Sequence, residues 1–136
     1  MIEGINHLTL SVSDLDRAFA FYTDVLGCRP LARWRHGAYL LAGETTWICL
    51  ALDAHVRTTP LPEYTHIAFS ITRDAFAEAV RRLQTSGASS WKENTSEGDS
   101  IYFLDPDGHK LELHVGDWRS RMQACREHPY DGMVFF

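Results

Sequence analysis

Two histidines and one glutamate in this sequence could together bind a divalent metal ion. His7 begins an alternating run of apolar and polar residues, and His66 begins a second run of the same kind. Glu112 lies in a third run among core-type residues, where an unpaired carboxylate would be costly to desolvate. Two imidazoles and one carboxylate suit Mn, Fe, Zn or Ni and leave coordination positions open for a ligand. A lone strand histidine is more often a structural hydrogen-bonder, so the prediction depends on the repetition.

Strand alternation places these three side chains on the faces that point away from the core. The apolar faces of the three runs carry Leu8, Leu10 and Val12, then Ile67, Phe69 and Ile71, then Leu111, Leu113 and Val115. His7, His66 and Glu112 lie on the opposite faces. His114 shares the face of Glu112 and is a reserve ligand. Cys49 or its neighbour is the counterpart of Glu112 in the first copy, so we expect no fourth protein ligand.

The chain repeats one unit twice. Each histidine strand is followed by a segment with helical spacing, which ends at Gly27 in the first copy and at Gly87 in the second. About 60 positions separate His7 from His66, and nearly the same number separates the two glycines. Strand, helix and stop recur in step, so we predict two copies of one module.

The remaining patterns complete an α+β fold of paired βαβββ modules. Further strands are expected at residues 30–34, 38–42 and 47–52, then at 90–93, 100–104 and 109–115, and a short helix at 118–126. Ile48, Leu50 and Leu52 are expected in the core. Asp53 to Glu63, with two prolines, is the expected linker. We therefore predict a single domain of residues 1–136, with modules at 1–55 and 64–116 and a helix and tail at 117–136.

Composition excludes several classes of protein. The net charge of −5 and the lack of a basic stripe argue against nucleic acid as a partner. No apolar run of about 18 residues could span a membrane, and the N-terminus lacks signal-peptide features, so a cytoplasmic protein is expected. The cysteines Cys28, Cys49 and Cys125 form no CxxC pair and are expected to be reduced and mostly buried.

Three segments carry a resemblance that covers almost the whole chain. They are Asn6-His7-Leu8-Thr9-Leu10, the loop Ser96-Glu97-Gly98-Asp99-Ser100, and the run from Tyr102 through Asp105-Pro106-Asp107-Gly108-His109 to Gly116. These segments resemble the glutathione-dependent fosfomycin resistance enzymes of the FosA type, which are part of the vicinal oxygen chelate superfamily. The resemblance implies a transferase that opens the epoxide of fosfomycin by adding the glutathione thiol, which confers antibiotic resistance. It also implies Mn(II), a potassium activator and a domain-swapped homodimer.

The resemblance assigns roles to residues by their position in these motifs. It implies Mn(II) ligands at His7, His66 and Glu112, and a potassium site at Asn94, Ser96, Gly98 and Ser100. Catalytic roles are implied for Thr9, Tyr39, Lys92 and Arg121, and a glutathione site for Tyr39 and Trp34. Substrate contacts are implied for Thr9, Trp47, Cys49, Lys92, Ser96, Ser100, Tyr102 and Arg121. In the swapped dimer, His7 would meet His66 and Glu112 across subunits.

Some alternatives stay open at this point. Thr95 stands where relatives usually carry arginine, so the preferred thiol is open between glutathione and cysteine or another thiol. A fosfomycin hydrolase with a glutamate base is a second possibility, for which Glu44 could be considered, although a solvated turn carboxylate is the simpler interpretation of that residue. An Fe(II) extradiol dioxygenase would not need the Lys92, Ser96 and Arg121 cluster. A non-catalytic drug-binding protein would have no use for three metal ligands. The native metal and the evolved substrate also stay open.

Overall fold

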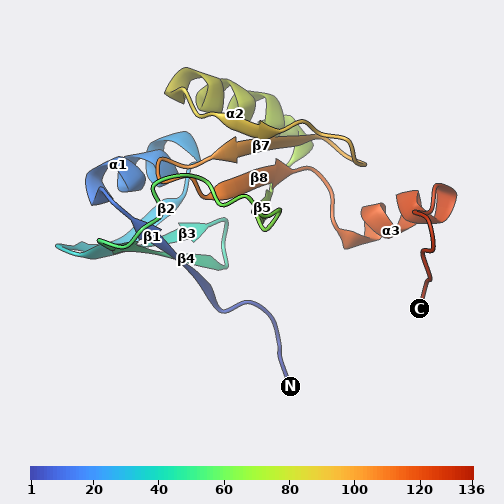
Figure 1. The fold of residues 1–136 in the computed structure, drawn as a ribbon, viewed down its shortest axis with the longest axis horizontal. Coiled ribbons are helices and arrows are strands. Elements are labelled where there is room, and N and C mark those ends of the chain that lie inside the picture. Colours follow the sequence, from blue (N-terminus) through green and yellow to red (C-terminus); the bar gives the residue numbers. More distant parts are fainter.

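The computed structural model describes residues 1–136, which form two similar modules followed by a helix (Figure 1). The first module contains β1 (His7–Val12), α1 (Leu15–Ala20), the π-helix η1 (Phe21–Val25), β2 (Arg29–Trp34), β3 (Gly37–Ala42) and β4 (Thr46–Leu52). The second contains β5 (Ile67–Ser70), α2 (Arg73–Ser86), β6 (Ser90–Lys92), β7 (Ser100–Leu104) and β8 (Lys110–His114). The last helix, α3 (Trp118–Glu127), lies beyond the two sheets and leads to the C-terminus (Figure 1).

Each module builds one mixed sheet of four strands. The strand orders are β1-β4-β3-β2 and β5-β8-β7-β6, and the parallel pairs are β1 with β4 and β5 with β8. The other neighbours are antiparallel. The prediction of an α+β fold with two βαβββ modules is therefore confirmed. His7 is the first residue of edge strand β1, and His66 directly precedes edge strand β5.

The strand registers show which residues of the two modules correspond. Cys49 of β4 pairs with Tyr39 of β3, and Glu112 of β8 pairs with Tyr102 of β7. Cys49 therefore holds in the first module the place that Glu112 holds in the second, as the sequence predicted. The first module has no carboxylate at this position, so the two faces are equivalent in shape but different in chemistry.

The first helix differs from the regular helix that the spacing predicts. The Asp14 side chain accepts a hydrogen bond from the Arg17 N–H and caps α1. From Phe21 onward the turns widen into a π-helix, in which the Leu26 N–H donates to the Phe21 carbonyl at 3.1 Å. A π turn inserts one extra residue, and as a result the neighbouring rings of Phe21 and Tyr22 are both buried. The helix ends before Gly27, where the sequence places its stop.

The two modules of the chain share one core and a buried polar contact. Buried residues of both modules form a single apolar cluster. At its edge the Tyr22 hydroxyl donates to Asp105 at 2.8 Å, and both groups are buried. The Ser13 backbone N–H and hydroxyl both donate to Asp107, at 3.0 and 2.5 Å. The Asp-Pro-Asp-Gly turn of the second module is therefore bonded to the first helix and strand end of the first module.

One core assignment is wrong. Ile48 and Leu50 are buried as predicted, but Leu52 is 42% exposed. Leu52 is the last residue of β4, where the sheet ends and the linker begins, so strand alternation alone does not give it a covering layer. No helix of the chain is both long and apolar enough to cross a membrane.

Candidate metal and substrate site

His66 and Glu112 lie close together on the open face of the second sheet. The His66 Nε2 atom is 3.0 Å from Glu112 Oε2, and Glu112 is only 6% exposed. The other ring nitrogen, Nδ1, is 2.9 Å from the Tyr64 carbonyl oxygen, which can only accept, so Nδ1 carries the proton. With one proton on the ring, the lone pair of Nε2 points toward the carboxylate.

Two electron-pair donors that face each other at this distance fit a shared cation. Two ligands bound at about 2.1 Å and at right angles are separated by about 3 Å, which is the spacing of Nε2 and Oε2. A ligating histidine commonly donates its other N–H to a backbone carbonyl, as His66 does to Tyr64. The donor set therefore fits a divalent metal. Without a metal, a second proton on His66 would let Nε2 donate to Glu112 at the same distance.

His7 does not join this pair within one chain. Its Nδ1 atom is 2.7 Å from Asn6 Oδ1, and its ring lies against Trp47 with centroids 4.9 Å apart. No three histidine, cysteine, aspartate or glutamate side chains of the chain could hold a metal ion together. His7 and His66 do line one cleft of about 870 Å³ between the edge strands. One chain therefore brings two of the three predicted ligands together.

Hydrogen bonds link Glu112 to Ser100 and Ser100 to His114. The Ser100 Oγ atom is 2.6 Å from Glu112 Oε1 and 2.7 Å from His114 Nδ1. The separation of His114 Nδ1 from Glu112 Oε1 is 3.6 Å. His114, the reserve ligand, therefore reaches Glu112 mainly through Ser100.

Lys92 lies on the same row of the second sheet as Glu112. Lys92 of β6 pairs with Tyr102 of β7, which in turn pairs with Glu112. The Lys92 Nζ atom lies 4.9 Å from the centre of the Tyr102 ring and donates to the Glu93 carbonyl at 3.0 Å and to Thr95 Oγ1 at 3.3 Å. The structure thus brings together the cation, the phenol and the carboxylate that the sequence predicts for one site.

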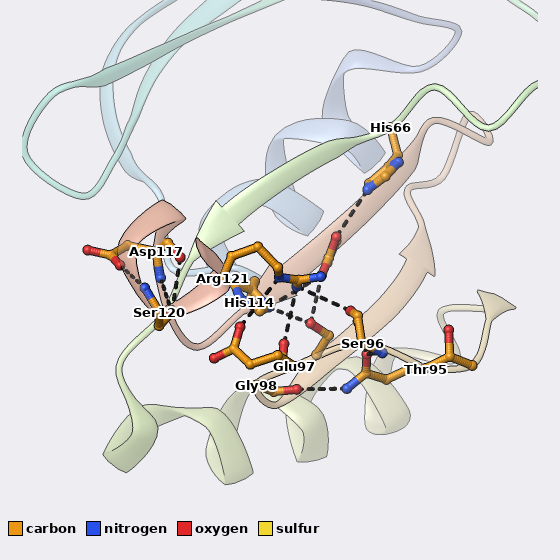
Figure 2. A network of polar contacts seen from close by, with 12 residues as sticks. His66, Thr95, Ser96, Glu97, Gly98, His114, Asp117, Ser120 and Arg121 are labelled. Carbon is orange, nitrogen blue, oxygen red and sulfur yellow. Dashed lines mark hydrogen bonds and ion pairs between the residues drawn. The ribbon is translucent and has the colours of Figure 1, made fainter. Parts of the chain in front are cut away.

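The second predicted cation arrives from the C-terminal helix. Arg121 of α3 donates through Nη2 to Ser96 Oγ and to the Glu97 carbonyl, both at 3.2 Å (Figure 2). Its Nε atom lies 3.4 Å from Glu97 Oε2. Burial lowers the pKa of Arg121, but hydrogen bonding to Tyr130 and the negative charge of Glu97 raise it more, so the pKa lies above its usual value. Arg121 therefore holds a permanent positive charge beside the loop that contains Ser96 and Glu97.

The predicted potassium loop closes on itself. The Asn94 amide nitrogen donates to the Gly98 carbonyl at 2.8 Å, and Asn94 Oδ1 accepts from the Ser96 N–H at 3.1 Å. Gly98 has a φ of +81°, and a Cβ there would lie 2.5 Å from the Val115 carbonyl oxygen. The loop packs so tightly against the end of β8 that only glycine fits at this position.

The open face of the first sheet carries a row of aromatic rings. Tyr39 lies between Trp34 and Trp47, with ring centroids 4.8 and 5.1 Å away. Thr9 pairs with Cys49 across β1 and β4, and this places both on the face of Tyr39. Thr9 and His66 line a cleft of about 560 Å³. The first module therefore offers a mainly apolar wall, and the second module offers the charges.

A further cleft lies away from this chemistry. It has a volume of about 1000 Å³ and is lined by parts of α1, the linker and the Asp-Pro-Asp-Gly turn, including Arg17, Arg57 and Pro106. None of the predicted metal, substrate or thiol residues lines it.

A family model described as the glyoxalase/bleomycin resistance protein/dioxygenase superfamily matches residues 4–113. The chain belongs to this superfamily. Members with curated descriptions match over nearly the full length. The glutathione transferase FosA of Serratia marcescens is 50% identical over 137 residues, which cover 99% of this chain and 96% of that protein. The metallothiol transferase FosB of Shouchella clausii is 40% identical and covers 98% of this chain and 94% of that protein. Within the superfamily the chain is thus a FosA homologue.

Solved structures of the superfamily support the fold. A glutamate-to-glutamine mutant of the fosfomycin resistance protein FosX from Listeria monocytogenes, complexed with Mn(II) and 1S,2S-dihydroxypropylphosphonic acid, superposes with a TM-score of 0.79. It is 29% identical and the match covers 90% of this chain and 99% of that one. A second crystal structure of the same FosX protein has a TM-score of 0.78 at 30% identity and covers 91% of this chain and 99% of that one. The two-module arrangement is therefore the fold of fosfomycin resistance proteins in this superfamily.

Two contacts in the candidate site were not predicted from the sequence. Trp91 lies beside the candidate ligand His66, with ring centroids 5.3 Å apart. Glu97 faces Arg121 and reduces the free charge that this guanidinium offers to an anion. Both residues adjoin positions that the sequence does single out, Lys92 and Ser96, so their place in the chain was the available signal.

Proposed function

We propose that this protein is a metal-dependent thiol transferase that inactivates fosfomycin by adding the thiol of glutathione to its epoxide. The 50% identity to a glutathione transferase FosA over 99% of the chain is the observation that carries the proposal. The arrangement of His66 beside Glu112, with Glu112 in the same sheet row as Lys92 and Tyr102 and with Arg121 bonded to the Ser96 loop, supports it. A metal position with cations around it suits a small phosphonate.

The metal is proposed to be Mn(II), held by His66 and Glu112 of one chain and by His7 of a second copy. Mixed imidazole and carboxylate ligands suit this ion, and the 3.0 Å spacing of the first two donors fits it. When bound, Mn(II) supplies Lewis-acid stabilisation of the negative charge that develops on the epoxide oxygen.

The chain's own cations are proposed to bind the phosphonate. Lys92 and Arg121 provide positive charge in a protein of net charge −5, and Ser96 and Tyr102 provide hydroxyl donors. In the structure Lys92 is bonded to Thr95, and Arg121 to Ser96 and Glu97. Both side chains would exchange these internal partners for phosphonate oxygens, which are stronger acceptors.

The thiol is proposed to approach along the aromatic row of the first module. Tyr39 is 37% exposed and its hydroxyl can donate to the sulfur and favour the thiolate, the reactive form. Trp34 would line the glutathione site, and Trp47 and Cys49 the wall beside the substrate. Thr9, on the same face, would hydrogen-bond the substrate near the epoxide. The sulfur then attacks an epoxide carbon, the C–S bond forms as the C–O bond breaks, and the oxygen takes up a proton.

A potassium ion is proposed to bind at the loop of Asn94, Ser96, Gly98 and Ser100. Carbonyl and hydroxyl oxygens suit a hard monovalent cation, and the loop packs closely against the end of β8, so an ion bound there would lie near the proposed phosphonate position. Its positive charge would strengthen the attraction of the site for the dianionic substrate.

The active form is proposed to be a homodimer in which modules of the two copies face each other. His7 lies apart from His66 and Glu112 in one chain, and β1 and β5 are open sheet edges. The aromatic residues Trp34, Tyr39 and Tyr64 are 45%, 37% and 60% exposed. A second copy would cover these rings and complete the ligand set.

Hydrolysis of the epoxide is the second candidate activity. The FosX structure that superposes on this chain is complexed with a dihydroxypropylphosphonic acid. Hydrolysis needs a general base near the metal, and Glu44, the residue considered for this role, is exposed in the turn between β3 and β4 and lines the same cleft as His7 and His66. Thiol addition is the better supported activity because the identity to a glutathione transferase is 50%, against 29% to this FosX structure.

Mass spectrometry of fosfomycin after incubation tests both candidates. The purified protein is mixed with fosfomycin, Mn(II), K⁺ and either glutathione or cysteine. We expect a glutathione adduct that is lost in Glu112→Gln and retained in Glu127→Gln, a matched change at an exposed site. A product that gains only water would support hydrolysis, and unreacted fosfomycin in all arms would refute both activities.

A further inference from the structure

The two hydrogen bonds that link His114, Ser100 and Glu112 can be donated in only one direction. An ionised carboxylate only accepts hydrogen bonds, so the single hydroxyl hydrogen of Ser100 is donated to Glu112 Oε1, 2.6 Å away. The Ser100 oxygen must then accept from His114 Nδ1 at 2.7 Å. His114 therefore carries its proton on Nδ1, and the orientation of the Ser100 hydroxyl is set by the imidazole behind it.

The packing around His114 fixes the ring in this position. A Cβ at Gly98 would lie 2.9 Å from His114 Cε1, and a Cβ at Gly116 would lie 3.0 Å from His114 Nε2. Both glycines have positive φ, +81° and +137°. The backbone on both sides of the imidazole thus approaches more closely than any other residue would allow. The His114 ring is therefore held in one position, with Nδ1 toward the Ser100 oxygen.

The two carboxylate oxygens of Glu112 contact different groups. Oε1 accepts from Ser100, and Oε2 faces His66 Nε2 at 3.0 Å. The carboxylate is thereby held with only one oxygen toward the candidate metal position. The Ser100 oxygen keeps one lone pair after these two bonds, which is free for a cation in the loop.

We propose that His114 is a positioning residue for the metal centre. By donating to Ser100, His114 orients the hydroxyl that holds Glu112 as a one-oxygen ligand. This inference rests on the proposed metal site and adds a residue to it that does not touch metal or substrate. Loss of a partner of this kind typically weakens metal binding about 10- to 100-fold.

Matched substitutions at His114 and Ser100 test the proposal through the dissociation constant of Mn(II). His114→Asn keeps an amide N–H near the place of Nδ1, whereas His114→Gln moves the amide away from it. The constant is measured by electron paramagnetic resonance of free Mn(II), without fosfomycin and without K⁺. We expect a rise of about tenfold for His114→Gln and Ser100→Ala, and a rise of less than about threefold for His114→Asn.

The double variant separates a relay from two independent effects. If His114 acts through Ser100, Ser100→Ala/His114→Gln should bind Mn(II) no more weakly than Ser100→Ala alone. The midpoint of thermal unfolding of the metal-free proteins is measured in parallel. A merely structural role would lower this midpoint in both His114 variants and would give additive losses in the double variant.

Two results of the Mn(II) measurements would also overturn the inference. Unchanged Mn(II) affinity in His114→Gln, with the wild type binding Mn(II), refutes the positioning role and leaves the proposed function intact. A wild type that fails to bind Mn(II) refutes the metal site and the positioning role together.

Discussion

The buried hydrogen bond between Tyr22 and Asp105 gives a prediction about how the two modules of one chain are joined. Tyr22 belongs to the first module and Asp105 to the second, and the hydroxyl donates to Oδ2 at 2.8 Å. The other oxygen of Asp105 already accepts two backbone N–H groups, from Asp107 and His109, each at 2.9 Å. Tyr22→Phe removes the donor from a buried carboxylate oxygen and leaves the ring in place.

The expected loss of stability follows from this geometry. A hydrogen bond to a charged, buried partner contributes about 1.5 to 3 kcal/mol, and the unchanged ring adds no cavity term. We therefore expect Tyr22→Phe to lower the free energy of unfolding by about 2 kcal/mol. For a chain of 136 residues, each kcal/mol corresponds to about 3 to 4 °C, so the unfolding midpoint should fall by about 7 °C.

The same contact predicts how the effect changes with pH. Burial, and then the charge and hydrogen bond of Asp105, raise the pKa of Tyr22 well above its usual value of about 10. Below pH 10 the phenol is neutral in both states and its contribution is fully present. As pH rises above 10, only the unfolded chain loses the proton, and the contribution is lost toward the folded-state pKa. The difference between wild type and Tyr22→Phe should therefore begin to shrink near pH 10 and continue to shrink as pH rises to about 11.

Thermal unfolding followed by circular dichroism at one fixed protein concentration measures these shifts. Tyr64→Phe is the matched control, because Tyr64 is 60% exposed within the chain and the substitution keeps the ring that the proposed dimer would cover, so the midpoint should change by less than about 1 °C. A midpoint for Tyr22→Phe within about 1 °C of wild type at pH 7 would refute the intrachain contact between the modules. A difference that stays constant up to about pH 11 would refute the explanation by the raised pKa.

Three further outcomes follow from the site and its surroundings. Gly98→Ala should lower thermal stability and abolish stimulation by K⁺ in the adduct assay, because the added Cβ would lie 2.5 Å from the Val115 carbonyl oxygen. Lys92→Met should raise the KM for fosfomycin by about tenfold or more with little change in the Mn(II) dissociation constant, and a change in the metal constant instead would contradict its assignment to the phosphonate. Burial raises the pKa of Cys28 to about 11, so its alkylation by iodoacetamide at pH 8, followed by mass spectrometry, should be much slower in the folded than in the denatured protein.

Strand alternation and the repeat predicted most of the fold because both depend on local physics. A buried face needs apolar residues at every second position, and Leu10, Val12 and Leu111 are buried as this rule requires. The rule fails at Leu52, since burial at a strand end depends on what lies above it in space. It also does not predict the π-helix at Phe21–Val25, because spacing alone does not show where an extra residue is inserted into a helix.

The ligand residues could be chosen from the sequence, but their partners could not. His66 and Glu112 lie 46 positions apart in sequence, and their contact follows from the pairing of β5 with β8. The link from Ser100 to His114 is also a cross-strand pair, between β7 and β8. Patterns within one strand give the face of a side chain, whereas these contacts need the register between strands.

The correspondence between the modules explains why one module cannot complete the site. The repeat gives each module a histidine at the start of its edge strand, but the carboxylate position is Glu112 in the second module and Cys49 in the first. A set of two histidines and one carboxylate therefore needs both open faces. Within one chain the modules are joined by their cores and by Tyr22 and Asp105, on the side away from those faces. Under the proposed dimer, each site combines modules of two chains, so the contact that fixes the modules of one chain also sets the distance between the two sites.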